Sequence, residues 1–241
     1  TKDGFHNGNN TAYLIEKYDN EKNSFERESC NVIDFGLDFY APQTLESTDG
    51  RRIMIGWMQS WENRIVAANF KWCGMMTIPR ELTIKDGCLI QNPIREIENY
   101  YKNTVEYNNL TIKDEVSLDG IFGRELDITI DIDGSQAEEF KIKLAKNNEY
   151  ETIINFNSKK NIIEFDRTYS GIYGDILHKR EMKVSDKKGK VKMRLIIDKY
   201  SVEIFANDGE QVMTSTFYTP LEATDITFAS EGNSIINIKK H

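Results

Sequence analysis

The sequence lacks the patterns of several large protein classes. No stretch is long and apolar enough to span a bilayer, and the polar start from Thr1 to Gly4 is unlike a signal peptide. We therefore expect no membrane association and a cytoplasmic location. Basic stripes are missing too, since the net charge is −8 and the lysines are scattered among acids. This charge pattern disfavours nucleic acid as a partner and favours a neutral small molecule.

Metal and nucleotide motifs are also absent. The sequence has three cysteines, an odd number without Cys-x-x-Cys spacing, and three histidines that lie far apart. These spacings argue against a disulfide framework and against a zinc site. The expected free, buried thiols are those of Cys30, Cys73 and Cys88. Neither a Gly-x-x-x-x-Gly-Lys phosphate loop nor a Gly-x-Ser-x-Gly elbow occurs, so we expect no metal and no cofactor.

The chain has the length and composition of a globular protein and the patterns of an all-β fold. With 241 residues, of which 39% are hydrophobic, it can form one large domain or two small ones. Residues 82–84 and 88–90 are apolar runs around the turn Asp86-Gly87, which predicts a hairpin. In the second half the apolar period is two, which predicts strands with one buried and one wet face. This alternation is found in 126–132, 140–144 and 202–204, with turns expected at Asp133-Gly134, Asn147-Asn148, Asn157-Ser158 and 207–209.

One stretch has a high density of carboxylates and aromatic rings. Residues 34–44 read Asp-Phe-Gly-Leu-Asp-Phe-Tyr-Ala-Pro-Gln-Thr, and an apolar strand from Arg52 to Met58 follows the turn Asp49-Gly50. Two neighbouring strands are then expected to share an edge that carries Asp38, Tyr40 and Trp57. Aromatic rings beside a carboxylate suit a sugar, because its C–H faces stack on rings and its hydroxyls need polar partners. The alternative is that both rings are core aromatics and the acid belongs to a turn.

These motifs resemble glycoside hydrolase family 32. The resemblance rests on residues 34–44, on Gly-Arg-Arg-Ile-x-x-Gly-Trp-Met-x-x-Trp at 50–61, on Ile-Pro-Arg-Glu-Leu at 78–82, and on Ser-Val-Glu-Ile-Phe-Ala-Asn-Asp-Gly-Glu at 201–210. The family contains invertases, sucrose-6-phosphate hydrolases, levanases and inulinases. The resemblance implies Tyr40 and Trp57 as sugar-facing residues, with Asp38 a weaker candidate. Arg80 and Glu81 are expected either to form an ion pair with each other or to touch substrate.

The resemblance also implies a domain organisation. The family fold is a five-bladed β-propeller joined to a C-terminal antiparallel β-sandwich. Residues 1–98 would then hold only the last blades of the propeller, and residues 99–241 the sandwich with its linker. The expected linker follows Asn92-Pro93, where 94–101 is a short stretch with helical character. A partial propeller exposes strand edges, so we expect residues 1–98 to self-associate or to be disordered.

The family's catalytic motifs are missing from the sequence. A retaining mechanism on fructosides needs two carboxyl groups about 5 Å apart. In the family these groups belong to Asn-Asp-Pro-Asn-Gly and Glu-Cys, with a third acid in Arg-Asp-Pro, and none of these strings occurs here. Glu28-Ser29-Cys30 is only a chance likeness, because serine interrupts the pair. We assign no catalytic residue.

Three functional interpretations follow. In the first, the chain is the C-terminal fragment of a retaining β-fructofuranosidase that acts on sucrose, sucrose 6-phosphate or fructans. In the second, it is a non-catalytic carbohydrate-binding or interface module. In the third, Asp34 and Asp38 are themselves a working carboxylate pair, since they lie four positions apart around a glycine. The sequence does not choose among the fructosides.

Overall fold

The hairpin at Asp86-Gly87 forms as the sequence predicts and closes a small antiparallel sheet. The structure is a computed structural model that describes residues 11–59 and 72–241, so Trp61 lies outside the described part. Strands β6 (Arg80–Lys85) and β7 (Cys88–Pro93) pair in register across this turn, and both turn residues have positive φ. Strands β3 (Tyr40–Glu46) and β4 (Arg52–Met58) extend the sheet in the order β3-β4-β6-β7, and the short β5 (Met75–Met76) pairs with β4.

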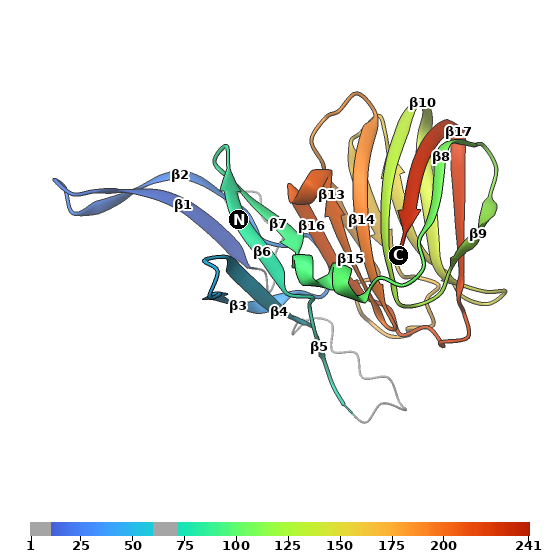
Figure 1. The fold of residues 1–241 in the computed structure, drawn as a ribbon, viewed down its shortest axis with the longest axis horizontal. Helices are drawn as coiled ribbons and strands as arrows, with labels where there is room; N and C mark the ends of the chain where they lie inside the picture. Colours follow the sequence, from blue (N-terminus) through green and yellow to red (C-terminus); the bar gives the residue numbers. More distant parts are fainter. Residues whose placement is uncertain (1–10, 60–71) are drawn as a thin grey trace.

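Two further strands precede this sheet. Strands β1 (Ala12–Asp19) and β2 (Ser24–Val32) pair only with each other among the described residues. Figure 1 shows this ribbon extending away from both larger sheets. Its outward side chains include Leu14 and Phe25, which are 52% and 66% exposed. The ribbon therefore leaves apolar side chains and strand edges in contact with solvent.

A short 3-10 helix, η1 (Arg95–Tyr100), leads from the small sheet into the second half of the chain. It lies where the sequence predicted a linker with helical character. A second 3-10 turn, η2 (Asn207–Gly209), follows the strand that carries the downstream motif. No helix in the described ranges is long and apolar enough to cross a membrane.

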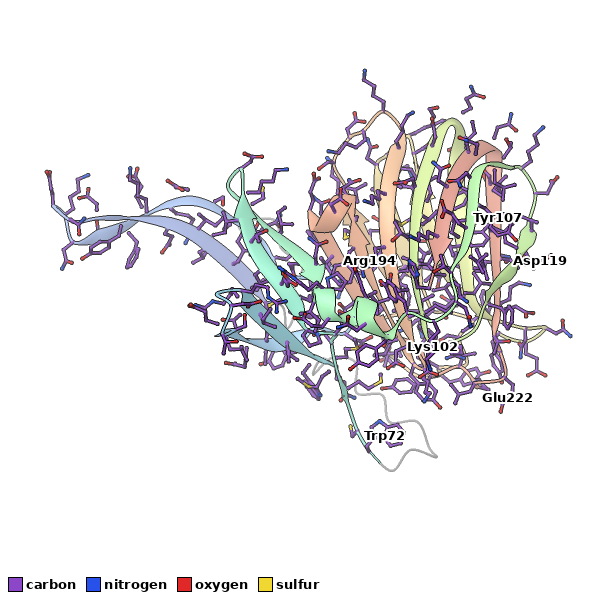
Figure 2. The ribbon with its side chains drawn as sticks, in the orientation of Figure 1. Trp72, Lys102, Tyr107, Asp119, Arg194 and Glu222 are labelled. Carbon is purple, nitrogen blue, oxygen red and sulfur yellow. The ribbon has the colours of Figure 1, made fainter. Side chains whose placement is uncertain are left out.

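The second half is one ten-stranded antiparallel sheet that curls around its own core. Its strands are β8 (Val105–Ile112), β9 (Val116–Phe122), β10 (Leu126–Lys146), β11 (Thr152–Asn157), β12 (Ile162–Asp166), β13 (Lys179–Lys183), β14 (Lys190–Asp198), β15 (Ser201–Ala206), β16 (Gln211–Thr216) and β17 (Asp225–Lys240). The predicted alternation holds along β10, where Ile128, Ile130 and Ile132 are at most 2% exposed. Directly before Ile128, Asp127 pairs with Arg194 at 2.6 Å; Figure 2 labels Arg194 on the sheet. The all-β prediction is confirmed.

The turn predicted at Asp133-Gly134 is wrong. Strand β10 continues through it as a bulge, with a shift in its pairing with β17 between Asp133 and Gln136. The backbone N–H of Gly134 donates to Gly189 O at 2.9 Å, and the N–H of Ser135 donates to the Asp133 carboxylate at 3.1 Å. The bulge lets one strand pair with β14 before the bend and with β11 after it.

Two other expectations need correction. Cys73 and Cys88 are exposed rather than buried, and Cys30 is partly buried. Glu203, expected on a wet strand face, is 2% exposed. Every residue of β15 is buried, because one of its faces packs on the core of the large sheet and the other packs against the small sheet.

Candidate functional site

Tyr40 and Trp57 lie side by side on β3 and β4, as the sequence predicted. They are directly paired in the strand register, and their ring centroids are 6.4 Å apart in an edge-to-face arrangement. Both side chains are half-buried. Gly74 lies on the indole, because a Cβ added there would be 2.3 Å from Nε1 of Trp57. The two rings form a partly open aromatic surface, which we call the aromatic wall.

Asp38 is bound to the large sheet. Its carboxylate is 1% exposed and accepts hydrogen bonds at Oδ2 from Arg167 Nη1 at 2.6 Å, and from the backbone N–H and hydroxyl of Thr216 at 2.9 Å each. Asp38 therefore connects the entry of β3 to the second half of the chain. A direct contact between Asp38 and substrate stays a prediction.

A second buried cluster centres on Arg80, whose side chain has no solvent exposure. Its guanidinium donates to Oε2 of Glu203 at 3.0 and 2.6 Å and to Oδ2 of Asp34 at 3.0 Å. Burial raises the pKa of Glu203, because the charged carboxylate loses its hydration. Burial opposes the charge of Arg80, but Glu203 and Asp34 outweigh it and raise the pKa of the guanidinium. The cluster links β6, the segment before β3, and β15.

Two glycines show how closely the first half of the chain approaches the second where the Arg80 cluster links them. A Cβ on Gly36 would be 1.8 Å from the backbone oxygen of Thr214 on β16. A Cβ on Gly209 would be 2.0 Å from Gln91 O on β7. The backbone N–H of Phe35 donates to Val212 O at 2.8 Å, so the segment before β3 lies along the edge of β16. The motifs at 34–38, 78–80 and 203–209 thus form the joint between the two halves.

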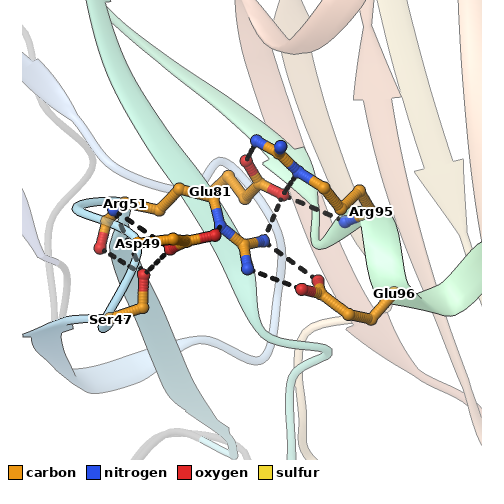
Figure 3. A network of polar contacts seen from close by, with 6 residues as sticks. All are labelled: Ser47, Asp49, Arg51, Glu81, Arg95 and Glu96. Atoms are coloured by element: carbon orange, nitrogen blue, oxygen red, sulfur yellow. Dashed lines mark hydrogen bonds and ion pairs between the residues drawn. The ribbon is translucent and has the colours of Figure 1, made fainter.

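Arg80 and Glu81 do not pair with each other, because successive residues of β6 point to opposite faces. Glu81 instead accepts from Arg51 and Arg95, each at 2.8 Å, and Arg51 also contacts Glu96 at 3.0 Å (Figure 3). The hydrogen bond from Arg95, followed by those from the Arg95 backbone and Arg51, lowers the pKa of Glu81 to about 2, although partial burial opposes the shift. This network joins the turn after β3 to β6 and η1.

A cleft of about 670 Å³ lies between the two halves. Its lining includes Met58, Met76, Tyr100 and His241, and includes neither Tyr40 nor Trp57. Met58 follows Trp57 in β4, so these two side chains leave that strand on opposite faces. Within 11–59 and 72–241, no three His, Cys, Asp or Glu side chains are grouped to hold a metal ion.

Two family models match the chain in succession. The model described as "Glycosyl hydrolases family 32 N-terminal domain" matches residues 1–93, and "Glycosyl hydrolases family 32 C terminal" matches residues 96–241. The chain belongs to glycosyl hydrolase family 32. This confirms the resemblance inferred from the motifs.

Curated relatives in family 32 are longer than this chain. Sucrose-6-phosphate hydrolase from Staphylococcus xylosus is 31% identical over 238 residues, which cover 98% of this chain and 48% of that protein. Levanase from Bacillus subtilis is 29% identical, and the aligned region covers 86% of this chain and 33% of the levanase. The chain therefore spans about half of the first of these relatives and a third of the second.

Solved family 32 structures share the fold. Exo-inulinase from Aspergillus awamori superposes with a TM-score of 0.81 at 21% identity, covering 96% of this chain and 49% of that chain. Sucrose-6-phosphate hydrolase from Lactobacillus gasseri gives a TM-score of 0.78 at 23% identity, covering 94% and 46%. At these identities the likeness shows the fold alone.

Sequence reasoning missed the residues of the second half of the chain that bind the carboxylates of Asp34 and Asp38 in the 34–44 motif. Arg167, Thr214 and Thr216 lie in no motif, and they are 129 to 180 residues from the carboxylates that they contact. No local pattern could have identified them. Glu203 did lie in a family 32 motif, but its place in an alternating strand predicted a solvent-exposed side chain.

Proposed function

We propose that this chain is the C-terminal part of a retaining β-fructofuranosidase acting on sucrose, sucrose 6-phosphate or fructans. The observation that carries the proposal is the match of both family 32 models, in order, over residues 1–93 and 96–241. The names of the relatives, sucrose-6-phosphate hydrolase and levanase, supply the substrate class. Tyr40 and Trp57 are the residues that we assign to sugar contact.

We further propose that the sheet β3-β4-β6-β7 is the last blade of a five-bladed propeller and that β1 and β2 belong to the blade before it. A four-stranded antiparallel meander is the pattern of one blade. The large sheet would be the β-sandwich, with β10 and β17 long enough to contribute to both of its layers. The domain boundary at residues 98 and 99 then falls within η1.

The catalytic carboxylates are assigned to polypeptide outside these 241 residues. Retaining hydrolysis needs a carboxylate nucleophile and a carboxylic acid about 5 Å apart across the scissile bond. The buried acids Asp34, Asp38 and Glu203 are instead ion-paired with Arg80 or Arg167. This pairing argues against Asp34 and Asp38 as the working pair. The chain would supply one wall of a pocket that other polypeptide completes.

Calorimetric titration tests the sugar contact. The chain is titrated with fructose, sucrose and a short inulin oligosaccharide, and Trp57→Ala is compared with Trp72→Ala. Trp72 is 56% exposed and lies on the segment that leads to β5 (Figure 2). We expect binding to be lost in Trp57→Ala and kept in Trp72→Ala. Equal binding by both variants would contradict the assignment of the aromatic wall.

Hydrolysis tests the assignment of the carboxylates. We expect the chain alone, at high enzyme concentration, to release no fructose from sucrose, sucrose 6-phosphate or inulin. Release well above that of Trp57→Ala would show that a working carboxylate pair is present in the chain. Glu28, Asp34 and Asp38 would then be the first acids to substitute.

One observation favours the second candidate function, a carbohydrate-binding module. Tyr169 and Tyr173 lie between β12 and β13, and their side chains are 66% and 88% exposed. Exposed rings can stack on sugar faces without any catalytic group nearby. In that case Tyr173→Ala, and not Trp57→Ala, would abolish binding in the same titration. The cytoplasmic location stays a prediction.

A further inference from the structure

Three consecutive residues at the entry of β3 are each held by a different contact. Asp38 is bound by Arg167 and Thr216. The centre of the Phe39 ring lies 5.0 Å from the guanidinium carbon of Arg80, and the ring packs so closely on Gly56 that a Cβ added there would be 2.4 Å away. Tyr40 then meets Trp57 across the strand pair. Tyr40 therefore directly follows two residues that are each held by the surrounding structure.

The ladder of β3 and β4 does not fix Tyr40 by itself. The register shifts between Tyr40 and Gln43, so a bulge separates the paired Tyr40 and Trp57 from the regular ladder that follows. Ala41, within this bulge, has a φ of +45°, which is unfavourable for a residue with a Cβ. Such a backbone persists only where the surroundings hold it in place. The anchor at Asp38 lies on the other side of Tyr40 from this strained residue.

Arg167 is built to hold Asp38 in one place. Its guanidinium has no solvent exposure. Nε and Nη2 donate to Leu177 O at 3.2 and 3.0 Å, and Nη1 donates to Asp38 at 2.6 Å and to Thr216 O at 2.8 Å. Because a planar guanidinium bonded along two edges cannot rotate, the carboxylate of Asp38 is restricted in both distance and direction.

We propose that Arg167, in the second half of the chain, is a positioning residue for the aromatic wall in the first half. Acting through Asp38, it sets the Tyr40 ring against Trp57 across the bulge at Ala41. The large sheet is then part of the binding apparatus as well as a source of stability. The effect on sugar binding rests on the proposed function, whereas the effect on ring geometry does not.

The test uses the full chain with Trp61→Phe and Trp72→Phe, which leaves Trp57 as its single tryptophan. Arg167→Lys keeps the positive charge but replaces the planar guanidinium, with its several N–H donors, by a single ammonium group. The matched control is Arg194→Lys, because Arg194 pairs with Asp127 at the same 2.6 Å but entirely within the second half. Folding is followed by far-UV circular dichroism, and the environment of Trp57 by its emission maximum and by acrylamide quenching.

We expect Arg167→Lys to keep the β signal while Trp57 emission shifts to the red and its quenching increases. Fructose affinity in calorimetry should fall about ten-fold, as expected when a binding group is displaced. The control should leave both properties of Trp57 unchanged. A folded Arg167→Lys chain with unchanged Trp57 emission and quenching would overturn the proposal.

Loss of sugar binding and failure to fold each have a defined consequence for the proposal. If the single-tryptophan chain itself binds no sugar but Arg167→Lys still changes Trp57, the positioning role stands and the sugar contact of the proposed function fails. If Arg167→Lys does not fold, Asp38→Asn replaces it, because this change keeps the shape of the side chain and weakens the same contact. An unaltered Trp57 in folded Asp38→Asn would also overturn the proposal.

Discussion

Arg80 and Glu203 lie 123 residues apart in the sequence, yet two guanidinium nitrogens of Arg80 donate to one oxygen of Glu203 at 3.0 and 2.6 Å. The pair is almost completely removed from solvent. It joins β6 of the small sheet to β15 of the large one, and Asp34 binds the same guanidinium. Removing one member leaves a charge that is buried and incompletely compensated.

Glu203→Ala should therefore destabilise the chain strongly. Breaking a buried ion pair by removing one partner costs about 3 to 5 kcal/mol. Urea unfolding at neutral pH measures the loss. The control is Glu138→Ala, whose exposed pair with Lys159, also close at 2.7 Å, should contribute less than about 1 kcal/mol. Equal effects of the two substitutions would show that the buried cluster does not stabilise the joint.

Gly36→Ala should separate the two halves of the chain. The added methyl would overlap the backbone of Thr214, so the segment before β3 must leave β16, at a cost of about 1 to 3 kcal/mol. Limited proteolysis should then cleave residues 94–104 faster. Gly50→Ala is the control, because its Cβ would meet no atom within 4 Å, so its cost comes only from the backbone of the local turn, where φ is +83°. Unchanged cleavage in Gly36→Ala would contradict the close docking.

Low pH should lower the free energy of unfolding of the chain, in part because Glu81 becomes protonated. Its pKa is about 2 in the folded protein, against an ordinary value of 4.5, because Arg95 and Arg51 stabilise the carboxylate. Between these values the unfolded chain binds more protons, so stability is lost as the pH falls through this window. Urea unfolding at pH 5, 4 and 3 should show a shallower loss for Glu81→Gln than for the parent chain. Glu26→Gln, an exposed change on β2, should follow the parent. An equally steep loss in Glu81→Gln would count against the prediction.

The free ribbon of β1 and β2 should promote self-association. A two-stranded ribbon is marginal in water, and its outer edges can pair with another chain. Light scattering coupled to size exclusion should detect dimers or larger species whose fraction rises with concentration. Leu14→Lys with Phe25→Lys should reduce that fraction, because charges disfavour edge pairing. A strictly monomeric parent chain would rule this association out.

Local patterns predicted the strands and the hairpins of this chain well. Asp86-Gly87 specified its turn because two neighbouring residues with positive φ are a local requirement. Asp133-Gly134 carries a similar signal, but pairing with β14, β17 and β11 draws β10 through it. Gly134 therefore lies in a β-bulge within β10, and the chain does not reverse its direction there.

The placement of the motif acids could not be predicted in the same way. Asp34, Asp38 and Glu203 look like turn or surface acids in sequence, because the arginines that bind them lie at least 46 positions away. Tyr40 and Trp57 were placed correctly because they occupy adjacent strands joined by a short turn. Long-range burial is decided by which sheet faces meet, and no single strand encodes that.

Strand β17 pairs with β8, β9 and β10, and its partner residues precede it by 79 positions at Lys146 and Asp225 to 135 positions at Val105 and Lys240. During synthesis, β8 and β10 leave the ribosome long before residues 225–240 are made, and chains grow at about 5 to 20 residues per second. For several seconds these strands therefore have unfilled edges and an uncovered apolar face. Nascent chains are vulnerable to aggregation in this interval, because unpaired strand edges and apolar surface are exposed together.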